Sequence, residues 1–207
     1  TSTGFDVAGN NIGSGGNKVV YMAIRRGGMQ TPTAASDVFA VDSLGSTGDS
    51  ATPAFRSPFV ADMGMRVDIG EAYTEIGARL TQESWLYTNL NNAEASAGNS
   101  DWDYMNGWYT STSTASNYHG LMWARARGYF DVVTYSGTGS GSQNVSHNLG
   151  VVPEMMWIKV RNDADNWTVY HSALGNTKRL LLNGNDAVSS ANNIFFNNTT
   201  PTSSVFT

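Results

Sequence analysis

Residues 86–99, LYTNLNNAEASAGN, decide the fold, because they recur further along the chain as residues 180–193, LLLNGNDAVSSANN. Seven of the fourteen aligned positions are identical at a spacing of 94 residues. Repetition at a fixed period is the sequence signature of a structural unit that recurs along a chain. The identical pairs are Leu86/Leu180, Asn89/Asn183, Asn91/Asn185, Ala93/Ala187, Ser96/Ser190, Ala97/Ala191 and Asn99/Asn193.

Two further matches set the phase of this repeat. Residues 21–27 (YMAIRRG) resemble residues 122–128 (MWARARG) at a spacing of 101, and residues 1–5 weakly resemble residues 202–206. Leu80 and Leu174 extend the first match backwards at the spacing of 94. The phase predicts three segments: residues 1–27 as the terminal strands of a preceding repeat, residues 28–128 as a complete β repeat, and residues 129–207 as a second β repeat truncated at its C-terminal end.

The truncation leads to two expectations. We expect the full-length protein to continue past Thr207 with a sequence like that of residues 6–26. An incomplete unit leaves a strand edge open, and open edges pair readily with another strand. We therefore expect residues 1–27 to complete a neighbouring unit, in this chain or in another.

Strand signals dominate the chain, and Gly-rich or Asn-rich turns separate them. We found no sustained apolar stripe of helical period. Residues 72–81 suit a short helix or a strand, residues 89–99 suit one helical turn, and residues 136–142 (SGTGSGS) suit a hairpin loop. The sequence predicts an all-β fold of tandem β-sandwich-type repeats of about 100 residues each. The predicted strands are residues 19–25 (VVYMAIR), 130–135 (FDVVTY), 155–160 (MMWIKV), 167–171 (WTVYH) and 179–182 (RLLL).

Composition excludes several classes of function. Charged residues make up 14% of the chain and the net charge is −5. No basic stripe is visible, so we expect no nucleic-acid partner. The longest apolar runs, such as residues 151–160, are too short to span a bilayer, so we expect no membrane insertion. The chain has no cysteine, which excludes disulfides, thiolate metal sites and cysteine nucleophiles.

Nearly the whole chain resembles a family of proteins. The match is densest over residues 128–175, and it includes GYFDVVTYSGTG (128–139), VSHNLG (145–150), PEMMWIK (153–159), WTVYH (167–171) and Leu174-Gly175. This series resembles a repeat domain of phage tail-fibre-like and other virion-associated proteins, abundant in marine phages. The companion half of those proteins resembles GARLT (77–81), WLYTN (85–89), and Val38-Phe39 followed by PFV (58–60) and Asp62.

The resemblance implies a location in the virion, a β-rich fold and no assigned catalytic residue. The prediction is a structural virion appendage protein that contributes to host attachment. Its expected partners are other copies of itself, other virion proteins and a host surface polysaccharide. The alternatives are a secreted lectin-like adhesin module, a polysaccharide-cleaving virion enzyme, and a rod protein with no receptor role.

An aromatic and amide cluster is the candidate for receptor contact, because aromatic faces and amides commonly hold sugars. The alternative is core packing, which the aromatic pair Trp102/Phe196 at the spacing of 94 favours. The candidate receptor-binding residues are Trp85, Tyr87, Tyr104, Asn106, Tyr109 and Tyr118.

The titratable residues suit structural roles better than catalysis. We expect the ring of His147 to hydrogen-bond the backbone at a strand end, and His171 to be half-buried. The carboxylate pairs Glu71/Glu75 and Asp101/Asp103 form no recognisable catalytic motif, so we expect neither enzymatic activity nor a cofactor. Asp163 and Asp165 lie in a predicted turn and are a weak candidate for calcium, because the oxygen ligands are incomplete.

Overall fold

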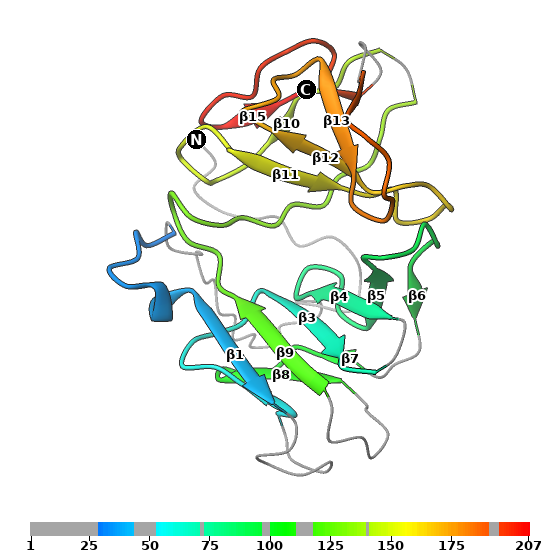
Figure 1. Cartoon of the computed structure of the whole chain (residues 1–207). Coiled ribbons are helices and arrows are strands. Elements are labelled where there is room, and N and C mark those ends of the chain that lie inside the picture. Colours follow the sequence, from blue (N-terminus) through cyan, green and yellow to red (C-terminus); the bar gives the residue numbers. More distant parts are fainter. Residues whose placement is uncertain are drawn as a thin grey trace, which may run out of the picture.

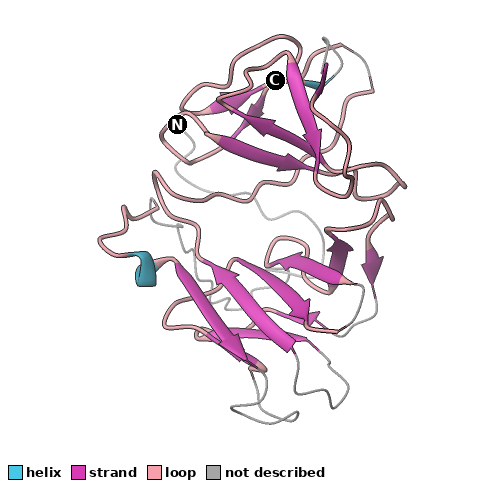
Figure 2. Cartoon of the chain, in the orientation of Figure 1, coloured by secondary structure: helices cyan, strands magenta, loops and turns pink. Residues whose placement is uncertain are grey.

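The computed structural model describes residues 29–43, 53–70, 73–96, 100–110, 118–139, 141–190 and 195–207. These residues form the all-β fold that the sequence predicts (Figures 1 and 2). A 3-10 turn, η1 (Ala35–Asp37), precedes the first strand. The carboxylate of Asp37 fixes this turn by accepting hydrogen bonds from the backbone N–H groups of Thr33 and Ala34 and from the Thr33 hydroxyl. No helix among the described residues is long and apolar enough to cross a membrane.

The first β unit, the lower part of Figure 1, consists of two antiparallel sheets. One has the order β1-β9-β3-β4-β5-β6 and the other the order β2-β8-β7. The strands are β1 (Phe39–Ser43), β2 (Phe55–Arg56), β3 (Met63–Asp68), β4 (Thr74–Ala78), β5 (Ser84–Tyr87), β6 (Ala95–Ser96), β7 (Ser100–Asp101), β8 (Gly107–Thr110) and β9 (Tyr118–Trp123).

The second β unit, the upper part of Figure 1, has a sheet of order β11-β12-β13-β14 and the pair β10-β15. Its strands are β10 (Val145–Ser146), β11 (Met155–Ile158), β12 (Thr168–His171), β13 (Lys178–Leu181), β14 (Ser189–Ser190) and β15 (Val205–Phe206). The predicted boundary between residues 128 and 129 falls in the connection between β9 and β10.

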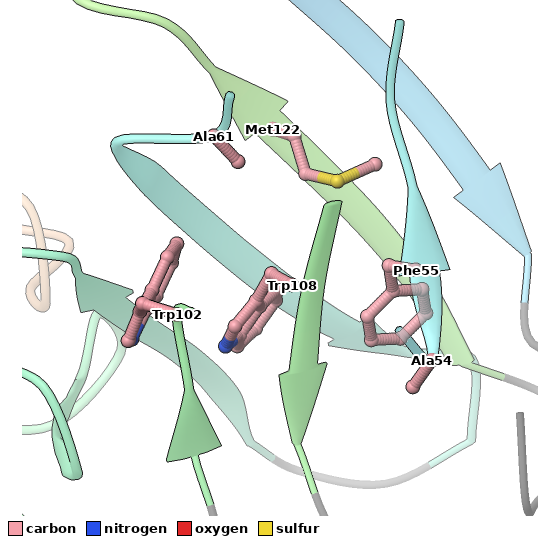
Figure 3. Close-up of a cluster of buried hydrophobic side chains, with 6 residues drawn as sticks. All are labelled: Ala54, Phe55, Ala61, Trp102, Trp108 and Met122. Carbon is pink, nitrogen blue, oxygen red and sulfur yellow. The ribbon is translucent and has the colours of Figure 1, made fainter. Parts of the chain in front are cut away.

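Aromatic rings fill the core between the two sheets of the first unit (Figure 3). Trp102 and Trp108 stack with their ring centroids 5.1 Å apart, and Phe55 packs 5.4 Å from Trp108. All three side chains are almost fully buried. Ala54, Ala61 and Met122 complete the cluster.

Glycines of the large sheet make room for these rings. A Cβ atom on Gly64 would lie 2.5 Å from the ring of Trp108, and one on Gly120 would overlap Phe55. Because these positions carry no side chain, the rings lie directly on the sheet backbone. The three contacts are Gly64 with Trp108, Gly77 with Trp102 and Gly120 with Phe55.

The two large sheets pair their strands in the same way. Ser84 lies opposite Ser96 in the β5–β6 pair, and Lys178 lies opposite Ser190 in the β13–β14 pair, each 94 residues further on. The β4–β5 and β12–β13 pairs also correspond, as do the β3–β4 and β11–β12 pairs. The repeated segments of the sequence therefore occupy equivalent places in two sheets.

Hydrogen bonds outside the ladders recur at the same places. Asn89 accepts a hydrogen bond from the backbone N–H of Thr74, and Asn183 accepts one from that of Trp167. The small sheets correspond too, because β10–β15 repeats the pairing of β2–β8. The recurring backbone bonds are Thr88 N to Thr74 O and Leu182 N to Trp167 O, Arg79 N to Asp62 O and Ser172 N to Glu154 O, and Ser57 N to Asn106 O and His147 N to Ser204 O.

The cores of the two units place large and small side chains differently at equivalent positions. Trp102 packs on Gly77 in the first unit. In the second unit Phe196 takes the place of Trp102, and Tyr170 takes the place of Gly77, with the two rings 5.5 Å apart in an edge-on contact. A smaller ring on one side thus accompanies a larger residue on the other, which keeps the interior filled.

One alignment predicted from the sequence is shifted by a residue. The structure places Leu174 at the position of Thr81 rather than Leu80, because Thr81 N donates to Ala78 O and Leu174 N donates to His171 O. The following residues, Gln82 and Gly175, both have positive φ, 50° and 74°. The β4–β5 connection is therefore matched with a spacing of 93, not 94.

The strand predicted at residues 130–135 is wrong for the described structure. Only an isolated bridge between Ala126 and Phe130 is present there, so the described residues of 136–142 do not connect two strands of a hairpin. A β-strand needs a neighbour for its backbone groups, and no described strand pairs with this segment. The strand predicted at residues 19–25 lies outside the described residues.

The two segments that the sequence allows to be helical are strands or turns in the structure. Residues 72–81 contain β4 rather than a helix. The described part of residues 89–99 contains β6 and no helical turn. The Asn-rich sequence of the repeat therefore forms a turn and a short strand.

Candidate functional site

The structure brings two of the predicted receptor residues, Tyr87 and Tyr118, to one end of the first unit. Tyr87 lies opposite Glu75 on β4, and Glu75 lies opposite Arg66 on β3. Arg66 also lies opposite Gly120 on β9, two residues after Tyr118. Since directly opposed residues, and residues two apart on a strand, share a face, these side chains form one row across the sheet.

An ion pair occupies the middle of this row. Nη2 of Arg66 lies 2.6 Å from Oε1 of Glu75, and both side chains are largely buried, 16% and 14% exposed. The Arg66 guanidinium stands 4.8 Å from the ring centre of Tyr118, close enough for a cation–π contact. Tyr73 packs 5.2 Å from Tyr87 at the end of the row.

Burial raises the pKa of Glu75 above its ordinary value, and the charge and hydrogen bond of Arg66 only partly oppose this shift. Sheet order thus places a carboxylate, a guanidinium and three tyrosines together. Such a set combines aromatic faces with hydrogen-bonding groups, as sites for polar ligands do. We call Arg66, Tyr73, Glu75, Tyr87 and Tyr118 the end cluster.

The remaining predicted residues do not join the end cluster. The Tyr104 carbonyl accepts a hydrogen bond from Nη2 of Arg79 at 3.0 Å, and the Asn106 carbonyl accepts one from the backbone N–H of Ser57. Both residues lie in the turn between β7 and β8. Tyr109 lies on β8 in the small sheet, away from the row, although it packs against the same core as Tyr118 does.

Trp85 is half-buried on β5, opposite Gly77. Its Nε1 is buried and has no hydrogen-bond partner among the described residues. Arg179, at the equivalent position of β13, likewise has a buried Nε without such a partner. The six predicted residues therefore form no single site.

The weak calcium candidate, Asp163 and Asp165, lies in the exposed loop between β11 and β12. Each carboxylate accepts a hydrogen bond from the next backbone N–H, at 2.7 Å. Nζ of Lys159 donates to the Asp163 carbonyl, so a positive charge already lies within this loop. Within the described part of the chain, no group of three or more His, Asp or Glu side chains could hold a metal ion.

The histidines have the structural roles that the sequence predicts. Nε2 of His147 lies 3.2 Å from the Thr202 carbonyl, and Nδ1 accepts a hydrogen bond from the backbone N–H of Leu149. His171 is half-buried, and its Nδ1 accepts one from Ala173. Asp101 accepts a hydrogen bond from the backbone N–H of Asp103, which fixes a local turn.

Sequence reasoning missed the contact between the two units. Nε1 of Trp167 donates to the Tyr87 carbonyl at 2.8 Å. Arg161 pairs with the Glu94 carboxylate at 2.7 Å, and the Arg161 carbonyl accepts a hydrogen bond from Glu94 N. These partners lie 67 to 80 residues apart, and no local pattern in the sequence signals the pairing.

Comparison with known proteins gives one match. Residues 69–207 match the model of a family described as a domain of unknown function, DUF7483. Searches of curated proteins and of solved structures give no significant match. The matched residues run from the end of β3 to the end of the chain, and so include most of the first unit and all of the second. The chain therefore belongs to the DUF7483 family.

Proposed function

We propose that this chain is a structural module of a virion appendage, built from one β unit repeated along its length. The observation that carries the proposal is the shared strand register of the β3–β6 and β11–β14 sheets. The resemblance of residues 128–175 to repeat domains of tail-fibre-like proteins supports the virion location.

Hydrogen bonds and an ion pair join the two units. The β5–β6 region of the first unit, with Tyr87 and Glu94, contacts the β11–β12 loop of the second, with Arg161 and Trp167. The counterpart of Trp167 in the first unit is Thr74, which pairs with Thr88 beside Tyr87, so corresponding ends of the two sheets meet in this contact.

Host attachment is the second part of the proposal, and the end cluster supports it. The cluster combines tyrosine faces with a charged pair, which suits the hydroxyl groups and apolar faces of a surface polysaccharide. We expect Tyr118→Ala to weaken binding of the chain to host polysaccharide on a glycan array. Tyr129→Ala, which changes an exposed tyrosine outside the cluster, should leave binding unchanged. Equal binding by both variants would contradict this role of the cluster.

Labelling of purified virus particles tests the structural role. Antibodies raised against residues 129–207 should decorate an appendage in electron micrographs, and the chain should be present in the particle proteome. A chain absent from the particles but secreted by cells would instead indicate a lectin-like adhesin. Release of oligosaccharides from host capsule by the isolated chain would indicate a polysaccharide-cleaving enzyme.

A further inference from the structure

The sheet of the second unit ends at a strand that is internal in the first. β3 of the first unit pairs with β9 on one side and β4 on the other. Its counterpart β11 pairs with β12, and among the described residues it is the edge of its sheet. Met155 and Trp157 on β11 are 51% and 40% exposed. The edge is thus apolar and exposed, a form that natural sheets normally cover.

The segment that should flank the missing strand on its other side is present. Residues 130–134 (FDVVT) share a Phe and a Val with β1 (FAVDS). They end 11 residues before β10, as β1 ends 12 residues before β2. β1 pairs only with β9 among the described strands, so without a β9 counterpart residues 130–134 have no ladder. One missing strand explains both the open edge and the failed strand prediction.

A segment outside the described residues aligns with the β9 region through the residues that follow the strand, Ala23/Ala124, Arg26/Arg127 and Gly27/Gly128. Residues 17–27 (NKVVYMAIRRG) align with residues 118–128 (YHGLMWARARG), which begin with β9. The register of β9 on β3 then predicts the pairing on β11. The expected opposed pairs are Met22 with Met155, Tyr21 with Met156, Val20 with Trp157 and Val19 with Ile158.

Core volumes fit this assignment. In the first unit Gly120 of β9 receives the ring of Phe55. The counterparts are Val19 and, on β10, Val145, which is buried. A smaller residue on the small sheet again accompanies a larger one on the large sheet, as for Phe196 and Tyr170. A valine at the position of Gly120 would overlap Phe55 in the first unit. In the second unit Val19 would face the smaller side chain of Val145 instead.

The connection allows the segment to come from the same chain. The Gln30 carbonyl accepts a hydrogen bond from the backbone N–H of Arg127, three residues before Phe130. Met22 is expected beside Phe130, because its counterpart Trp123 lies opposite Phe39 on β1. The chain from Met22 to Gln30 covers eight residue steps and can span up to about 27 Å. This length exceeds the distance that the three residue steps from Arg127 to Phe130 can cover.

We propose that residues 17–22 of this chain insert as a strand between β11 and residues 130–134, and so complete the second unit. The proposal rests on the unit equivalence used in the proposed function, but not on the virion location. Backbone hydrogen bonds on both sides would supply the affinity, and the alternating side chains would supply the register.

Paired cysteines test the insertion in the full chain, which has no cysteine of its own. Val20→Cys with Trp157→Cys places two thiols on one face of opposed residues, as does Met22→Cys with Met155→Cys. Val19→Cys with Trp157→Cys is the matched control, because in the proposed strand the side chain of Val19 would lie on the other face. Mild oxidation should link the first two pairs within one chain and the control pair far less.

The products are read by non-reducing electrophoresis and peptide mass spectrometry. Disulfides at both predicted pairs within monomers support the insertion. Disulfides that join two chains would overturn it and identify a second copy as the donor. Failure of both predicted pairs, or equal linkage of the control, would also overturn it. Particle labelling is independent of these results, so failure of the insertion is distinct from failure of the proposed function.

Discussion

At the scale of single residues, the fold depends on glycines that lie under aromatic rings. Trp108 cannot withdraw from Gly64, because Trp102 and Phe55 pack against it in the same core. We expect Gly64→Ala to lower the free energy of unfolding by about 1–3 kcal/mol, as overpacking of a filled core does. Urea unfolding measures the change.

Gly137→Ala is the control, because a Cβ atom at Gly137 meets no atom within 4 Å. It should change stability by no more than about 0.5 kcal/mol. An equal effect of the two substitutions would contradict the close packing of sheet and ring.

Glu75 gives the first unit a dependence on pH. Its raised pKa means that the folded chain holds the proton more tightly than the unfolded chain. The free energy of unfolding should therefore fall as pH rises from the ordinary value of 4.5 through the folded value. Glu75→Gln should flatten this decline, as urea midpoints between pH 4 and pH 7 would measure.

Glu83→Gln, which removes one exposed carboxylate next to β5, controls for the change in net charge. Its stability curve should keep the decline of the unsubstituted chain. A slope that survives in Glu75→Gln would show that burial of Glu75 is not its cause.

At the scale of elements, equivalent turns depend on equivalent asparagines. Asn183 accepts the Trp167 N–H at 2.8 Å and donates to Asn166, whereas Asn89 accepts the Thr74 N–H at 3.3 Å. Asn183→Ala should cost about 1 kcal/mol of stability, and Asn89→Ala should cost less because its bond is longer. Thermal unfolding compares the two variants. Asn185→Ala, an exposed position, should have no measurable effect.

The contact between the units depends on one indole N–H. Trp167→Phe keeps most of the buried ring but removes the hydrogen bond from Nε1 to the Tyr87 carbonyl. We expect a loss of about 1 kcal/mol in the free energy of unfolding. Trp157→Phe is the control, since that indole is partly exposed and, among the described residues, donates to the sulfur of Met155. Equal losses for both variants would contradict the role of Trp167.

At the scale of the whole molecule, the sequence predicts the all-β fold class, which the structure shows, and a tandem repeat, which stays a prediction. Alternating β-branched and aromatic residues indicate strands, and the Asn/Ala-rich segments give the spacing of 94 that the sheets reproduce. The sequence does not predict that Phe196 and Tyr170 take the places of Trp102 and Gly77 in the second unit. These substitutions compensate side-chain volume between strands that are far apart in the sequence.

The candidate site was predicted only in part. Tyr87 and Tyr118 lie in the end cluster, but Tyr104 and Asn106 lie in a turn whose carbonyls hold other groups. Arg66 was missed, because its partners Glu75 and Tyr118 come together only through the strand order β9-β3-β4. Strand order is a long-range property that residue patterns do not encode directly.

The central claim is that two sheets of this chain share one strand register. A map of cross-strand nuclear Overhauser effects tests it directly. We expect contacts between Ser84 and Ser96 and between Lys178 and Ser190, with the Asn/Ala-rich segments in turns and short strands in both units. A helical pattern in either segment, or a register shifted by one residue in only one sheet, would contradict the claim.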